Sequence, residues 1–220
     1  MKEGKSFEEI ISLDPYLGCF DDIASRVQQL GQSERNRLLS MCDRVFSDIA
    51  LRKDEPTRVA AAKVMTALVP DSADSIRRWI NTKSGKYIYE VHFPLFCFLD
   101  QLPDLPNGRE FAGEIPSLIG EYLLETKSET AHAAFMAGDL LGDHWETKEA
   151  LPILIKVAKQ AKYAAGRHSA IHGLGHVLRK LPDSDSSRET IVSLLRGAYE
   201  NDRSEDMRIT ARMLLEKQIL

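Results

Sequence analysis

The chain has 220 residues, of which 43% are hydrophobic and 28% charged, and its formal net charge is −4. This composition is typical of a folded protein and excludes intrinsic disorder. A mildly acidic chain lacks the dense lysine and arginine that nucleic acids and anionic membranes attract, and no stretch approaches the roughly 20 apolar residues of a membrane span. We therefore expect neither nucleic acid nor membrane as a partner.

The cysteines indicate a reducing compartment. Cys19, Cys42 and Cys97 are odd in number and are never spaced as CxxC. Cys42 and Cys97 have apolar neighbours, where a free thiol behaves as a small buried hydrophobe. The N-terminal stretch Met1–Ser12 has no continuous apolar core of the kind found in a secretion signal. These features predict a cytoplasmic protein.

The first half of the chain reads as helices, because its apolar residues follow the helical period rather than the alternation of a strand. Residues 1–32 are expected to form an N-terminal cap of one or two short helices. Two helix pairs are then predicted, with Pro94 kinking or delaying the last helix. Their ranges are Ser33–Leu51 with Glu55–Leu68, and Asp71–Asn81 with Tyr87–Leu102.

Three further pairs follow: Arg109–Thr126 with Glu129–His144, Lys148–Ala161 with Tyr163–Leu181, and Arg188–Tyr199 with Glu205–Gln218. An internal repeat links the first two of these pairs. Ile115–Ile119 matches Leu151–Ile155 at a spacing of 36 residues, and His132–Phe135 matches His168–Ile171 at the same spacing. A third copy continues with Ile191, Leu194 and Leu195. The chain is therefore predicted to be one all-α repeat domain, 1–220, with helix pairs over 33–220.

A short signature opens the second helix of several pairs. Arg167–Gly175 has an arginine, small residues three or four positions later, and then Leu-Gly, while Arg58–Ala62 and Arg208–Ala211 repeat its opening. This pattern resembles HEAT repeats, including the short bacterial (PBS-lyase) kind. The resemblance implies an armadillo-like, right-handed α–α superhelix of about five helix pairs. It also implies an exposed groove that holds a protein or peptide.

Histidines cluster in the second half of the chain. His168, His172 and His176 are spaced by four, so they share one side of a helix, opposite Ala170 and Leu174. We expect them to point outward. Stacking at the repeat offset would set His132, Met136 and Asp143 beside them and would allow an Asp143–Arg179 ion pair. The predicted partner-binding surface comprises His132, Met136, Asp143, His144, His168, His172, His176 and Arg179.

A metal site is the alternative use of the same histidines, because neutral imidazoles four residues apart can share one ion. Here the chain is similar to deoxyhypusine hydroxylases, HEAT-like enzymes that bind two irons through His-Glu dipeptides. His132 and His168 match those histidines, but Ala133 and Ser169 occupy the glutamate positions. Asp139 and Asp143 are the only nearby acids that can substitute. We therefore expect a polar surface without metal or cofactor.

Other motifs favour packing over chemistry. There is no phosphate loop, nucleophile elbow or HExxH motif, and Gly173 and Gly175 lie mid-helix, where small residues allow close packing. Arg77-Arg78-Trp79 is the only cluster of the kind that HEAT-like DNA glycosylases use, and we expect Trp79 to face the core. The aromatic residues of 87–98 are likewise assigned to the core, and Trp145 to an exposed linker.

These observations together predict a non-catalytic module that binds a protein or peptide along its second helices. The alternative function is a metalloprotein that combines some of the histidines with Asp139 or Asp143.

Overall fold

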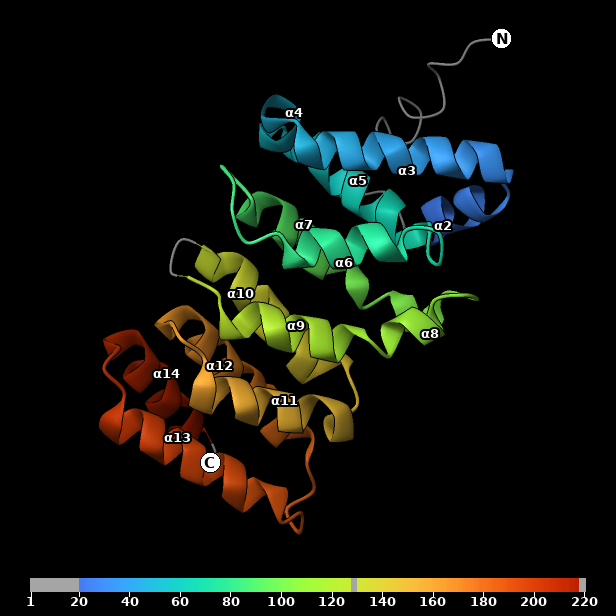
Figure 1. Cartoon of the computed structure of the whole chain (residues 1–220). Helices are drawn as coiled ribbons and strands as arrows, with labels where there is room; N and C mark the ends of the chain where they lie inside the picture. Colours follow the sequence, from blue (N-terminus) through green and yellow to red (C-terminus); the bar gives the residue numbers. More distant parts are fainter. Residues whose placement is uncertain (1–19, 128–129, 218–220) are drawn as a thin grey trace. The chain divides into compact units, whose positions relative to one another are not determined.

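The computed structural model describes residues 20–127 and 130–217, and within them the regular structure is entirely helical (Figure 1). The all-α prediction is therefore confirmed. The chain groups into two compact units, Met1–Ile115 and Pro116–Leu220. The single repeat domain over 1–220 stays a prediction. Of the helices in the described ranges, none has the length and apolar character needed to cross a bilayer.

The first unit is built around helix α5, which is covered on several sides. Its elements are α2 (Phe20–Gln28), α3 (Gln32–Ser47), α4 (Ile49–Lys53), α5 (Glu55–Ala67), α6 (Ala73–Asn81), α7 (Tyr89–Leu99), η1 (Leu102–Asp104) and α8 (Arg109–Ala112). α5 packs against α2, α3 and α7. Ala60, Ala61 and Ala62 are fully buried along it. Because alanine adds only a methyl group, helices can approach α5 closely on more than one face.

The predicted helix Ser33–Leu51 is interrupted at Asp48, which the apolar pattern did not indicate. The Asp48 carboxylate accepts hydrogen bonds from the backbone N–H groups of Ala50, at 2.8 Å, and Leu51, at 3.3 Å. It thereby caps a new helix, α4. An aspartate side chain satisfies first-turn N–H groups that have no intrahelical partner, so a new helix start is stabilised there.

Aromatic residues of the first unit divide between core and surface. Trp79 is buried, as predicted, and its Nε1–H donates to Asp43 Oδ1 at 2.7 Å. Phe96 is buried, but Phe93 is 42% exposed, so the assignment of Phe93 to the core is wrong. Residues four apart share a face of a helix. Phe93 and Cys97 accordingly lie together on a face of α7 that no other described helix covers completely.

The second unit is built around α12. Its elements are α9 (Ile115–Leu124, from Pro116 on), α10 (Ala131–Asp139), the π-helix η3 (Leu140–His144), α11 (Thr147–Gln160), α12 (Ala164–Lys180), α13 (Ser187–Asn201) and α14 (Glu205–Glu216). α12 packs against α10, α11, α14 and η3. The predicted helix 109–126 is split between α8 and α9, and the predicted ends at Glu129 and Gln218 lie outside the described residues.

Trp145 is only 5% exposed, so its predicted exposure is wrong. The linker between η3 and α11 consists of Trp145 and Glu146 alone. Such a short linker keeps the indole against the helices it joins, where burial of its large apolar area is favourable. The Trp145 carbonyl also accepts a hydrogen bond from Lys180 Nζ, at 3.3 Å, on α12.

The arginines that open the second helices have a structural role. Each donates from Nη1 to a carbonyl oxygen where the preceding helix ends: Arg58 to Lys53 at 3.1 Å, Arg167 to Ala161 at 3.2 Å and Arg208 to Asp202 at 2.8 Å. The last carbonyls of a helix have no intrahelical donor, and a cation there also complements the helix dipole. In these three pairs the recurring arginine therefore links the second helix to the end of the first.

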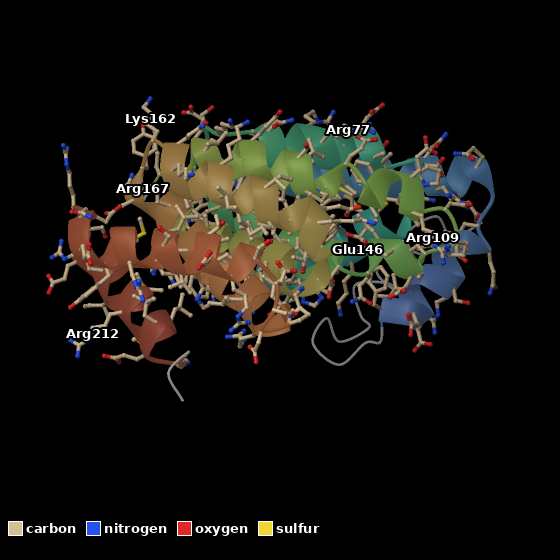
Figure 2. The ribbon with its side chains drawn as sticks, turned by 90° about the horizontal axis from the view of Figure 1, so that it is seen from below. Arg77, Arg109, Glu146, Lys162, Arg167 and Arg212 are labelled. Atoms are coloured by element: carbon tan, nitrogen blue, oxygen red, sulfur yellow. The ribbon has the colours of Figure 1, made fainter. Side chains whose placement is uncertain are left out.

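Replacing Arg167 with methionine should lower the free energy of unfolding by about 2 kcal/mol. The variant loses the bond to Ala161 and the paired bonds to Asp202, at 3.0 and 3.3 Å. Burial raises the pKa of Asp202, but the hydrogen bonds from Arg167 and from the Ser204 backbone, together with the charges of Arg167 and Arg208, more than offset this, so the net pKa is lowered. The matched control is Arg212→Met on α14 (Figure 2), whose pair with Glu216 is exposed; its effect in urea unfolding should stay below about 0.5 kcal/mol.

Candidate functional site

Three ligating atoms converge between α10 and α12. Asp139 Oδ1 lies 2.9 Å from His172 Nε2 and 3.2 Å from His176 Nε2, and the two Nε2 atoms are 3.0 Å apart. Asp139 is the last residue of α10, while both histidines lie in the middle of α12. Within the described part of the chain, these are the side chains whose ligating atoms cluster tightly enough to share one ion.

Glycines bring the two helices together at this point. A Cβ on Gly138 would lie 2.4 Å from the carbonyl oxygen of Ser169, and one on Gly142 would lie 2.6 Å from that of Gly173. The Ser169 hydroxyl also donates to the carbonyl of Ala134. Backbones can meet this closely only where side chains are absent. Gly138 immediately precedes Asp139, and Gly173 immediately follows His172. The close contact at the glycines therefore places the Asp139 carboxylate next to the His172 imidazole.

The predicted packing role of Gly173 and Gly175 is confirmed. A Cβ on Gly173 would lie 2.6 Å from the carbonyl oxygen of Gly138, and one on Gly175 would lie 2.5 Å from Leu214 Cδ2 on α14. The two glycines therefore admit neighbouring helices on two sides of α12.

The contacts between α10 and α12 form a regular ladder. Phe135 contacts His168, Asp139 contacts His172 and Asp143 contacts His176, each pair 33 residues apart. Phe135 and Asp139 also contact the next histidine along α12, 37 residues further on. The sequence repeat of 36 residues predicts a different register, with His132 opposite His168. Among the described contacts, Phe135 rather than His132 meets His168, and the observed spacings of 33 and 37 lie on either side of 36. Gly138 lies against both Ser169 and Gly173, 31 and 35 residues further on, so these close contacts hold α10 between two turns of α12.

His176 is held from both sides of its ring. Its Nε2 faces Asp139, while its Nδ1 contacts the Asp143 carboxylate and lies 2.7 Å from Arg179 Nη2. No ion pair joins Asp143 to Arg179 in the described residues, so the predicted direct pair is replaced by this shared contact with His176. Asp143 reaches the ring from η3, and π-helical turns occur frequently at functional sites.

The histidines are less exposed than predicted. Side-chain exposure is 24% for His172, 26% for Asp139 and 12% for His176. The Phe135 ring covers His172, with the ring centroids 4.1 Å apart. α10 and η3 pack over the face of α12 that the sequence assigned to solvent. Neither Phe135 nor this coverage was predicted, although Phe135, Asp139 and Asp143 are spaced by four on one helical face.

The remaining predicted surface residues lie outside the cluster. His168 Nε2 is 2.8 Å from Thr210 Oγ1 on α14, a partner that the sequence analysis missed, and burial followed by the charge of His172 lowers the pKa of His168. His132 and His144 are exposed, and Met136 is half-buried. The eight predicted residues therefore do not form one surface. His172, His176 and Asp143 belong to the cluster around Asp139, and the other five lie at its margin.

A second candidate site is an apolar pocket in the first unit. It has a volume of about 440 Å³ and lies on helices α2, α5 and α7. Phe93 and Phe98 contribute aromatic rings to its lining, and Glu55, Arg58 and Lys63 contribute charged side chains. Phe20 stacks on Phe98, with the ring centroids 6.3 Å apart. This pocket was not predicted, because the aromatic stretch of α7 was assigned to the core.

Comparison of the chain with family models, with curated proteins and with solved structures found no match. The proposals below therefore depend on the geometry of this chain alone.

Proposed function

We propose that the chain is a HEAT-like α-solenoid that binds a protein or peptide and has no catalytic role. Support for the solenoid comes from hydrogen bonds between side chains and groups 35 to 37 residues away, close to the repeat length read in the sequence. Stacked repeats contact only their neighbours, so contacts at one repeat length are what such an architecture requires. The pairs are Arg35 with Asp71, Trp79 with Asp43, Arg77 with Glu114, Arg167 with Asp202 and Lys180 with Trp145.

The observation that carries the binding function is the pocket around Phe93. A large aromatic side chain that is 42% exposed beside a pocket of about 440 Å³ leaves apolar area in water. Such apolar pockets with a few charges at the rim are where interface anchors insert. We infer a partner segment that places an apolar side chain against Phe93 and Phe98. In the second unit, we propose a separate binding surface formed by His132, Met136, His144 and Arg179.

Nucleic acid is left out of the proposed partners because the basic cluster of α6 is already paired. Arg77 binds Glu114 and Asp74, and Arg78 binds Asp43 at 2.6 Å. Trp79 is buried and cannot stack on a base. A glycosylase-like groove needs free cations and exposed aromatics at this position.

A cytosolic location fits this proposal. Cys42 and Cys97 are free thiols. Burial raises the pKa of Cys42 far above its ordinary value, with a smaller contribution from the charge of Asp43. Burial raises the pKa of Cys97 to about 11, with a smaller contribution from the charge of Asp100. Thiols held in the protonated form react slowly and behave as core side chains.

Substituting Phe93 with serine should reduce partner capture at least tenfold, because the anchor's apolar contact is lost. The assay is affinity capture from lysate, followed by titration of the captured partner in recombinant form. The matched control is Tyr199→Ser on α13, a helix outside the pocket, where the aromatic ring is 43% exposed. Equal losses in both variants, or none in either, would count against the pocket. Both variants should unfold within about 0.5 kcal/mol of the wild type.

A further inference from the structure

We propose that Asp139, His172 and His176 bind one divalent first-row transition metal ion, with coordination positions left open to solvent. The site is independent of the Phe93 pocket and goes beyond the proposed binding function. It departs from the metal-free surface expected from the sequence, because the packing of the two helices brings Asp139 Oδ1 within 3.2 Å of both imidazoles.

The ligand triangle has the size that a metal ion requires. Its edges are 2.9, 3.2 and 3.0 Å. Three ligands about 2.1 Å from a common ion lie roughly 3.0 Å apart in adjacent octahedral positions and roughly 3.4 Å apart in a tetrahedron. The triangle therefore matches one face of an octahedron. Two imidazoles and one carboxylate on such a face are a known ligand set for divalent iron and its neighbours.

The lone pairs of Asp139 and the two imidazoles favour the binding of a cation between them. In the neutral tautomer whose Nδ1–H donates to the Asp143 carboxylate, Nε2 of His176 presents a lone pair toward Asp139. Asp139 Oδ1 is buried and accepts no well-aligned hydrogen bond, although two Nε2 atoms lie within 3.2 Å of it. In that tautomer two acceptors face one another across a short distance. A bound metal ion satisfies both of them and the Nε2 atom of His172.

The surroundings of His176 are those of a metal ligand. Histidines that bind metals nearly always donate their second ring N–H to a carboxylate, carbonyl or water, which fixes the tautomer and the ring orientation. Asp143 supplies that carboxylate when Nδ1 carries the proton, and Arg179 Nη2 also lies 2.7 Å from this nitrogen. This contact is independent of the ligand triangle, and it directs Nε2 of His176 toward Asp139.

The exposure of the cluster suggests an open site rather than a closed structural one. Three protein ligands leave at least one position for water or a small anionic ligand, whereas structural zinc sites use four. The side chains of His172 and Asp139 are each about a quarter exposed, although the ligating atom Asp139 Oδ1 is itself buried. The glycine contact fixes the backbone on both sides, so the ligands are held before an ion arrives.

The test uses the full chain without a His-tag, stripped with EDTA and titrated with Co²⁺ and then with Zn²⁺. We expect one Co²⁺ per chain, with visible absorption bands and a dissociation constant of micromolar or tighter, and displacement of Co²⁺ by Zn²⁺. His176→Gln and Asp139→Asn should each weaken Co²⁺ binding at least 100-fold. Asp143→Asn should weaken it about 10- to 100-fold, as expected for a residue that orients a ligand.

The matched controls are His132→Gln and His144→Gln, which remove exposed histidines of the same unit and should change the affinity less than twofold. Circular dichroism of each variant shows whether it remains folded. Absence of stoichiometric Co²⁺ and Zn²⁺ binding to the wild type would overturn the proposal. Binding that survives in folded Asp139→Asn and His176→Gln would overturn it as well. Partner capture by the Phe93 pocket is a separate readout, so the failure of one proposal does not imply failure of the other.

Discussion

Gly138→Ala should lower the free energy of unfolding by about 3 kcal/mol, even though alanine is the better helix former by about 1 kcal/mol. The added methyl carbon would lie 2.4 Å from both the carbonyl oxygen and the hydroxyl oxygen of Ser169. A backbone carbonyl cannot turn aside as the end of a flexible side chain can. α10 and α12 would have to separate, and the contacts along their interface would weaken together.

The matched control is Gly197→Ala on α13, where an added Cβ would meet nothing within 4 Å. The substitution there should raise the free energy of unfolding by about 0.5 to 1 kcal/mol through helix propensity alone. Urea unfolding followed by far-UV circular dichroism measures both variants. Changes of the same sign in the two variants would contradict the proposed contact. Because Gly138 adjoins Asp139, Gly138→Ala should also weaken Co²⁺ binding, whereas Gly197→Ala should not.

Acidification should destabilise the first unit through His92. The His92 ring is buried in α7, with its Nε2–H donating to the Trp79 carbonyl oxygen at 3.0 Å, and burial lowers its pKa from 6.5 to about 4. Between these two values the unfolded chain binds a proton that the folded chain does not, so stability falls as the pH falls. The contribution of His92 should decrease by about 3 kcal/mol between pH 7 and pH 4.

His92→Gln separates this effect from the titration of carboxylates and other histidines. Glutamine has a polar side chain of similar reach that does not titrate, so the variant should lose less stability between pH 7 and pH 4 than the wild type, although it is less stable at pH 7. The measurement is the urea midpoint and slope at pH 7, 5.5 and 4 on metal-free protein. Parallel pH profiles for the two proteins would show that His92 is not the group responsible.

Helix positions were largely predictable from the sequence. The predicted ranges 55–68, 148–161 and 163–181 differ from α5, α11 and α12 by one residue at most at each end. Their apolar residues follow the helical period, and the cap from Asp54 lies at the start of α5 rather than within it. Predictions were less accurate where a local interaction overrides that period. Examples are the cap at Asp48, which divides one predicted helix, and the π-helix after Asp139.

The candidate site was predictable only in part. The spacing of four along α12 determines that His168, His172 and His176 share a face, because 3.6 residues make one helical turn. Asp139 was recognised as a possible ligand, but nothing in the sequence indicated which residue of α10 meets which histidine. The repeat offset suggested His132 opposite His168, whereas Phe135 lies there.

The sequence by itself determined the helices, their order and the shared face of the histidines, because these depend on interactions within a few residues. The tertiary structure alone decided the register between α10 and α12, the coverage of His176 and the distance from Asp139 to two imidazoles. These depend on where two helices touch. That contact is made between backbone atoms at Gly138, Gly142 and Gly173, whose missing side chains leave no periodic signal in the sequence.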